Sequence, residues 1–139
     1  MTFQWVRPSL KQRKILEWWM EGSPFTALAY ILLEGSIRSA KTSTGSFSFV
    51  LWVMKNFTGE EFAFCGKTIG ACRRNLVRPL KQMLAAEPGF TVQDKLSVVE
   101  GPHLVISYCG HTNVFWIFGG KDESSQDLIQ GVTLAGIFF

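Results

Sequence analysis

Apolar positions in the first half of the chain change from helical spacing to short continuous runs. Residues 9–20 carry apolar side chains at helical spacing, and Ser9 and Gln12 have the spacing of a capping box, so we expect a helix there. The uncharged run Phe25–Leu33 has the length and bulk of a buried strand. A second helix is predicted over 41–57. It is apolar nearly all round, which is typical of a helix covered on both sides.

The second half of the chain continues with strands and one long helical stretch. Glu61–Gly66 predicts a second buried strand, which would complete a βαβ unit of two parallel strands with a right-handed crossover. Residues 69–86 predict a helical stretch in which Pro79 introduces a kink or starts a new helix. From Gly89 the apolar period changes to two, and the chain closes on an apolar run at 134–139 that we expect to be another buried strand. The intervening strands are expected at 90–99, 103–109 and 112–118.

Composition adds limits to this picture without assigning a partner. The 139 residues are 47% hydrophobic and 14% aromatic, which is typical of one folded domain and excludes a disordered chain. The net charge of +3 permits nucleic-acid contact but does not argue for it. The longest uncharged apolar run falls far short of the roughly 20 residues that cross a bilayer. We therefore expect no membrane role.

The cysteines and histidines point to a reduced, cytoplasmic protein without a metal site. The three cysteines are an odd number without C-x-x-C spacing, and the charged N-terminus does not read as a signal peptide. His103 and His111 stand eight residues apart with no third ligand nearby, so we expect ordinary polar histidines.

The most informative motif is the sequence GSIRSAKT at 35–42. It follows the pattern G-x-x-x-x-G-K-[ST] except that Ala40 replaces the second glycine. In this pattern backbone N–H groups surround the phosphates, the lysine neutralises the outer phosphates, and the hydroxyl holds Mg²⁺. The motif thus predicts ATP and Mg²⁺ as ligands, whereas an ordinary strand-to-helix turn is the alternative. The predicted nucleotide-binding residues of this loop are Gly35, Ser36, Ile37, Arg38, Ser39, Ala40, Lys41 and Thr42.

Roles within the loop differ. Lys41 and Thr42 are the candidate catalytic residues, and Thr42 is also the candidate Mg²⁺ ligand. Arg38 is a third candidate because its guanidinium can reach phosphate oxygens, although a solvent-facing or packing arginine fits equally well. The methyl group of Ala40 is tolerated where backbone approaches phosphate if that residue has a negative φ.

Three segments in order resemble the ATPase domain of phage terminase large subunits of the prophage PBSX type. They are EGSIRSAKT at 34–42, CGKTIGACRRN at 65–75 and FGGKDESSQDLIQGVTLAG at 118–136. The resemblance implies an α/β P-loop NTPase of the additional-strand type, with a mostly parallel central sheet flanked by helices. Residues 1–139 would then be the N-terminal part of one ATPase domain, incomplete and without the C-terminal nuclease domain.

The same resemblance implies a function and partners. Such proteins are ATP-driven motors that package viral DNA in the cytoplasm of the host cell. The implied partners are double-stranded DNA, the portal protein, the small terminase subunit and further copies of the same chain.

Individual positions can be matched to the family. Gln12 matches an upstream glutamine that reads adenine, with a simply solvated helical glutamine as the alternative. Gln130 with Gly131 matches an Arg-Gly pair whose arginine acts on a neighbouring subunit's ATP, and because this chain has glutamine there, no arginine finger is assigned. Residues 134–139 resemble the Walker B strand, after which the family carries an Asp-Glu pair that lies beyond Phe139. The nearest acids, Asp122, Glu123 and Asp127, lie in or just after a segment that reads as a polar turn.

A basic stripe on the 69–86 helix is the candidate DNA contact. On sequence alone, a solvated helix face is the favoured interpretation of the stripe, and contact with DNA phosphates is the alternative. Two rival functions stay open on the sequence: a different P-loop ATPase of the helicase type, and a non-catalytic protein such as an inactive prophage remnant or an interaction module. The stripe consists of Arg73, Arg74, Arg78 and Lys81.

Overall fold

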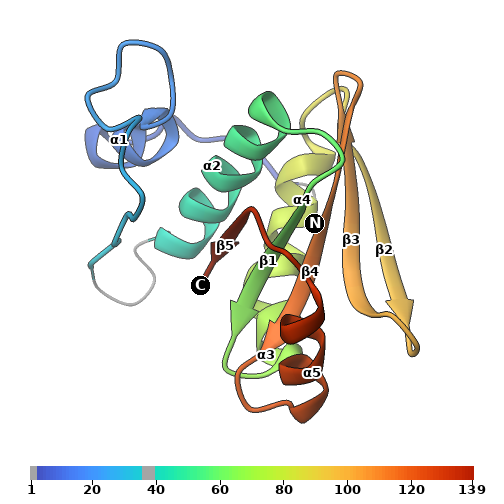
Figure 1. Cartoon of the computed structure of the whole chain (residues 1–139). Coiled ribbons are helices and arrows are strands. Elements are labelled where there is room, and N and C mark those ends of the chain that lie inside the picture. The colour runs from blue at the N-terminus through green and yellow to red at the C-terminus, as the bar shows by residue number, and fades with distance from the viewer. Residues whose placement is uncertain (1–2, 36–39) are drawn as a thin grey trace.

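The computed structural model describes residues 3–35 and 40–139 as one sheet flanked by helices (Figure 1). Most of the helices and strands lie where the capping residues and the hydrophobic periodicity of the sequence predict them. The helices are α1 (Leu10–Glu17), α2 (Lys41–Asn56), α3 (Ile69–Cys72), the π-helix η1 (Arg73–Val77), α4 (Arg78–Ala85) and α5 (Glu123–Gly131). The strands are β1 (Glu61–Gly66), β2 (Thr91–Ser97), β3 (Gly101–Tyr108), β4 (His111–Gly119) and β5 (Gly136–Phe138).

The five strands form one mixed sheet in the order β2-β3-β4-β1-β5. β1 pairs in parallel with β4 on one side and with β5 on the other. The pairs β2–β3 and β3–β4 are antiparallel, because short turns join these strands. The expectation of a mostly parallel sheet is therefore wrong. Parallel and antiparallel pairs are equal in number among the described strands.

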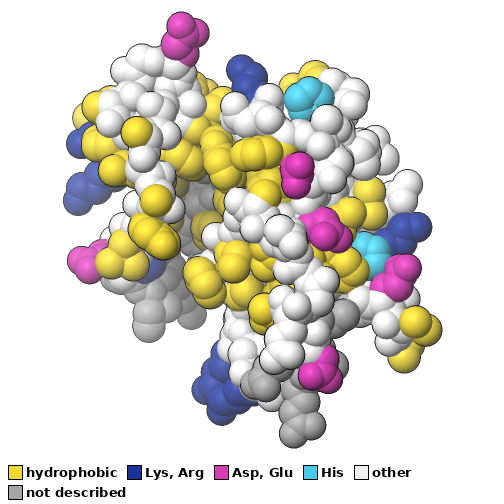
Figure 2. Space-filling model, viewed as in Figure 1, with side chains coloured by type: hydrophobic (Ala, Val, Ile, Leu, Met, Phe, Trp, Pro, Cys, Tyr) yellow, Lys and Arg dark blue, Asp and Glu magenta, His cyan; other side chains and the backbone are white. Residues whose placement is uncertain are grey.

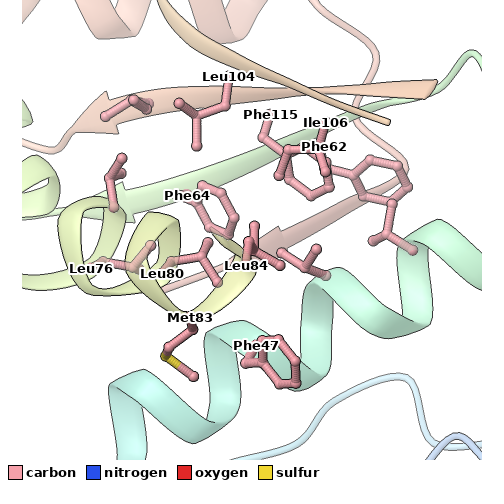
Figure 3. Close-up of a cluster of buried hydrophobic side chains, with 14 of the residues drawn as sticks. Phe47, Phe62, Phe64, Leu76, Leu80, Met83, Leu84, Leu104, Ile106 and Phe115 are labelled. Carbon is pink, nitrogen blue, oxygen red and sulfur yellow. The ribbon is translucent and has the colours of Figure 1, made fainter. Parts of the chain in front are cut away.

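The core lies between one face of this sheet and the helices α2 and α4 (Figure 3). Phe62 and Phe64 of β1 stack on Phe115 of β4, with ring centroids 5.5 and 5.2 Å apart. Burying an aliphatic or aromatic side chain of this size stabilises a fold by about 1.5–3 kcal/mol. The apolar side chains of the second helical stretch are buried here, namely Leu76, Leu80, Met83 and Leu84.

α2 is covered on several sides, as its apolar composition predicts. The N-terminal segment packs on it through Trp5, whose ring centroid lies 4.7 Å from that of Phe47. α1 is attached by a hydrogen bond in which the Ser48 hydroxyl donates to the carbonyl oxygen of Ile15 at 2.6 Å. The capping box of α1 is confirmed, although the helix ends at Glu17 rather than residue 20.

The predicted strand Phe25–Leu33 is wrong. The structure places this segment in turns and irregular chain outside the sheet, with Leu28, Tyr30 and Leu32 exposed by 52%, 91% and 82%. A strand needs a neighbouring strand for its backbone hydrogen bonds, and this segment has none among the described residues. The expected βαβ unit is consequently not formed.

The helical stretch 69–86 contains a change of helical type. α3 and α4 are joined by η1, where the N–H of Arg78 donates to the carbonyl of Arg73 in the π pattern. Pro79 stands in the first turn of α4, the position where a proline without an N–H costs least. A new helix therefore starts beside Pro79, as one of the two expectations allowed.

In the C-terminal third of the chain, three predicted strands are confirmed, one helix was not predicted, and one predicted strand is shorter and less buried than expected. The three period-two strands are confirmed as β2, β3 and β4. The segment beginning GGKDESS contains helix α5, which we expected to be a polar turn. β5 covers only 136–138, and it is not buried, since Ile137 is 43% exposed. No described helix has the length and apolar character that a membrane crossing requires.

Candidate nucleotide-binding site

The candidate site begins where α2 begins. Ala40 is the N-cap residue of α2 and adopts a left-handed conformation, with φ 59° and ψ 20°. The negative φ under which we expected an alanine to be tolerated is therefore not observed. A left-handed L-residue costs roughly 1–2 kcal/mol, which explains why the general motif has glycine at this position.

Ala40 itself supplies no side-chain cap to the start of α2. Alanine has no side-chain oxygen, so this N-cap residue makes no side-chain hydrogen bond to the helix. The first N–H groups of a helix have no intrahelical acceptor and carry the positive end of the helix dipole. Such a helix start favours an anionic group.

Lys41 and Gly35 close the loop across its two ends. The ammonium of Lys41 donates to the carbonyl oxygen of Gly35 at 2.6 Å. Thr42, the candidate Mg²⁺ ligand, follows directly in the first turn of α2 and is exposed. The remaining loop predictions lie outside the described residues, namely Ser36, Ile37, Arg38 and Ser39.

A cavity of about 550 Å³ lies beside Lys41 and Thr42. Ile15 of α1 and its C-cap residue Trp18 contribute to the wall, together with α2. The other walls are the apolar segment around residues 28–33 and the strand β5. Backbone and apolar side chains make most of this lining, and Lys41 is its one charged side chain among the described residues.

Gly45 is a residue of this region that the sequence analysis missed. A Cβ atom at Gly45 would lie 2.9 Å from Cδ1 of Leu33 and 3.0 Å from Cε2 of Phe138. The missing side chain therefore lets the segment before the loop and the strand β5 meet on the first turns of α2. A glycine four residues after the lysine of the motif was the only available signal.

Gln12 lies away from this cavity lining. Its side-chain oxygen accepts a hydrogen bond from the N–H of Ser9 at 2.9 Å, and Ser9 Oγ accepts from the N–H of Gln12 at 3.2 Å. The capping box thus fixes the orientation of the amide. The role of Gln12 in reading adenine stays a prediction.

Asp122 has a structural partner. Its carboxylate oxygen Oδ2 accepts a hydrogen bond from the N–H of Ile69 at 2.7 Å, so it caps the start of α3 from the β4–α5 connection. The backbone of Gly119 passes so close that no side chain would fit there. Ser125, 1% exposed, accepts a further bond from the N–H of Gly119. The structure therefore ties the segments 65–75 and 118–136 together.

Acidic groups do not gather into a metal centre. In the described parts of the chain no three His, Cys, Asp or Glu side chains come together as metal ligands would. Asp127 is exposed on α5, as is Gln130 near the end of that helix. His103 and His111 point to the backbone carbonyls of Gly101 and Phe57, as expected for ordinary polar histidines.

The basic stripe divides into two parts. Arg73 and Lys81 both bind the carboxylate of Asp94 on β2, at 2.7 and 3.0 Å. Arg74 and Arg78 are exposed and form no ion pair within the described residues. Two of the four predicted DNA-contact cations thus share one carboxylate, which offsets one of their two positive charges.

Comparison with known proteins gives matches among solved structures alone. No family model matches the chain, and no curated protein does. The chain is similar to the large terminase of a thermophilic bacteriophage, with a TM-score of 0.88 and 51% identity over 96% of this chain. The ADP complex of that terminase matches with a TM-score of 0.84 and 49% identity over 95% of this chain. Its complex with ATP-γ-S matches with a TM-score of 0.81 and 45% identity over 94% of this chain. The chain spans about a third of that terminase, since it covers 32%, 31% and 30% of the three structures.

Proposed function

We propose that this chain is the nucleotide-binding part of a terminase large subunit, an ATP-driven motor that packages viral DNA. The observation that carries the proposal is the start of α2, where Ala40, Lys41 and Thr42 form a helix start whose N-cap residue has no capping side chain, with the lysine beside it. The similarity to a terminase crystallised with ATP-γ-S and with ADP supports the same conclusion. The rival functions receive no support from these observations.

The proposed fold type is a P-loop NTPase of the additional-strand class. β5 pairs with β1 on one edge and has no strand partner on its other edge within the described chain. The apolar segment 28–33 stands across the cavity from that free edge. Neighbouring strands are spaced by about 4.8 Å, and a further strand placed in this groove would give both β5 and residues 28–33 a partner. This accounts for an apolar segment that lies exposed.

Each residue of the site has a proposed task. The ammonium of Lys41 would leave the carbonyl of Gly35 and neutralise the outer phosphates of ATP, while the helix start holds the phosphate oxygens. The hydroxyl of Thr42 would hold Mg²⁺, which when bound neutralises charge that develops on the phosphates. The carboxylates that orient water are expected from the acidic pair that the family carries after a strand matching β5.

The remaining partners are part of the proposal. Double-stranded DNA, the portal protein, the small terminase subunit and self-association follow from the proposed motor function, as does work in the host cytoplasm. The prophage PBSX-type family is the proposed origin.

The test is an equilibrium titration with a fluorescent ATP analogue in the presence of Mg²⁺. Lys41→Ala should weaken binding at least about tenfold, because a charge-assisted contact to phosphate is lost. Lys67→Ala is the matched control, since it removes an exposed lysine that does not line the cavity. Equal affinity for wild type and Lys41→Ala would contradict the assignment of Lys41 to the phosphates.

An assay of ATP hydrolysis distinguishes nucleotide binding from catalysis. Phosphate release by the 139-residue chain should stay at the level of Lys41→Ala, whereas a longer chain with the acidic pair should hydrolyse ATP. Lys41-dependent turnover by the 139 residues alone would show that the catalytic carboxylates lie within them.

A further inference from the structure

The positive charge of the chain is concentrated at its N-terminal helix. Of the 14 Lys and Arg and the 11 Asp and Glu, residues 7–17 hold four and one, and all other residues hold ten of each. The whole net charge of +3 therefore resides in this short segment. We call its four cations the α1 basic surface, namely Arg7, Lys11, Arg13 and Lys14.

The structure turns these cations outward. The side of α1 that faces α2 and the cavity carries Ile15 and Leu16, and Trp18 follows at the C-cap, which leaves the basic side chains exposed to solvent. Dark blue side chains accordingly lie at the outer side of α1 in Figure 2. Only Arg13 is paired, through a 3.3 Å contact to Glu17, and the other three cations form no ion pair with the described residues.

Two of the cations stand where a helix favours acids. Arg7 precedes the N-cap Ser9, and Lys11 lies in the first turn of α1, which contains no acidic residue. Positive charge at this end opposes the helix dipole, which favours anions there. Residues that lower the local stability of a helix without making a compensating contact are expected at functional positions. The dipole and the cations together produce a positive potential that an anion would relieve.

We infer that the α1 basic surface binds the phosphate backbone of duplex DNA. The choice of DNA among polyanions rests on the proposed motor function, whereas the position of the surface rests on charge and exposure. Lys11 and Lys14 lie one helical turn apart on an exposed face, a spacing that suits neighbouring phosphates. The η1–α4 stripe is the rival surface. Two of its four cations, Arg73 and Lys81, are held in ion pairs with Asp94, compared with one of four, Arg13, in the α1 basic surface.

The experiment measures binding of a short fluorescent DNA duplex by anisotropy between about 50 and 200 mM salt. Wild type should bind with strong salt dependence. Lys11→Gln with Lys14→Gln should lower affinity about tenfold at the low salt and reduce the slope of log K against log salt by about two. Lys67→Gln with Lys121→Gln is the matched control, since it removes two exposed lysines outside both surfaces, and it should change affinity less than about threefold. Arg74→Gln with Arg78→Gln tests the rival η1–α4 stripe and should also cost less than the Lys11/Lys14 variant.

Measurements of stability and of nucleotide binding distinguish a loss of DNA binding from misfolding and from a failure of the proposed function. The Lys11/Lys14 variant should keep the melting temperature of wild type, because Lys11 opposes the helix dipole in the first turn whereas Lys14 complements it in the last turn, so the two losses offset. The inference is overturned if wild type shows no salt-dependent DNA binding, or if the Arg74/Arg78 variant loses as much affinity as the Lys11/Lys14 variant. Either result together with Lys41-dependent nucleotide binding would leave the proposed function standing.

Discussion

Two regions of this protein differ in how completely their apolar side chains are buried. The body formed by β1, β3, β4 and α4 buries Phe62, Phe64, Leu80 and Leu84 completely. On the other side of β1, the strand β5 and the segment 25–33 leave large apolar side chains exposed around a cavity. The two regions differ in the strands and helices that surround them rather than in amino-acid composition. Both regions are rich in apolar residues, but only the first has strands and helices on all sides of its side chains.

The body is also tied by directional contacts from the β4–α5 connection. Asp122 caps α3 through the N–H of Ile69, and the N–H groups of Gly120 and Lys121 donate to the carbonyls of Gly66 and Lys67. By contrast, β5 is attached through a short pairing with β1. The comparison predicts that identical substitutions will have unequal effects in the two regions.

The largest effect should come from removing a leucine side chain. Leu84→Ala should lower the free energy of unfolding by about 3 kcal/mol, because Leu84 is fully buried and its loss leaves a cavity. Leu32→Ala, at an 82% exposed site, should change it by less than about 0.5 kcal/mol. Urea unfolding measures both. A large cost at Leu32 would mean that the segment 25–33 is packed in solution.

Adding one methyl group should give the next largest difference. Gly119→Ala should cost about 2 kcal/mol, because its Cβ would collide with the backbone of Ile69 and the carboxylate of Asp122. Gly45→Ala should stay within about 1 kcal/mol of wild type, because Leu33 and Phe138 meet it with the ends of their side chains and alanine favours the helix. Thermal unfolding compares the two variants. A cost at Gly45 equal to that at Gly119 would remove the distinction between the regions.

A smaller effect is expected at Ala40, within the open region itself. Ala40→Gly should raise the free energy of unfolding by about 1 kcal/mol, because glycine adopts φ 59° without the strain of a Cβ atom. Nucleotide affinity in the fluorescence titration should be unchanged or higher. A clear loss of affinity would show that the methyl group of Ala40 packs in the bound loop.

The smallest effect concerns thiol reactivity and needs no change in the fold. Burial raises the pKa of Cys72 to about 11, so its thiol stays protonated at about pH 8 and should react slowly with a disulfide reagent. Burial also raises the pKa of Cys65, whereas Cys109 is exposed in the β3–β4 turn. We expect one rapid equivalent at that pH, which Cys109→Ser should abolish. A second rapid equivalent, remaining in that variant, would indicate that the β1–α3 region opens.

Local patterns predicted most of the elements correctly. The capping residues Ser9 and Gln12, the strand Glu61–Gly66 and the three period-two strands all appear where the sequence places them. Such elements depend on short-range spacing, which survives in any tertiary context. Helix α5 was missed, because GGKDESS carries turn residues and the helix begins within them.

The sequence by itself predicted the chemistry of the candidate site, since Gly35, Lys41 and Thr42 stand at fixed spacing before a helix. Only the tertiary structure decided which apolar runs are buried, because burial depends on neighbours that are distant in sequence. It also decided the left-handed conformation of Ala40 and the pairing of Arg73 and Lys81 with Asp94. These depend on how α2 leaves the loop and on how β2 lies beside η1 and α4, which no local pattern encodes.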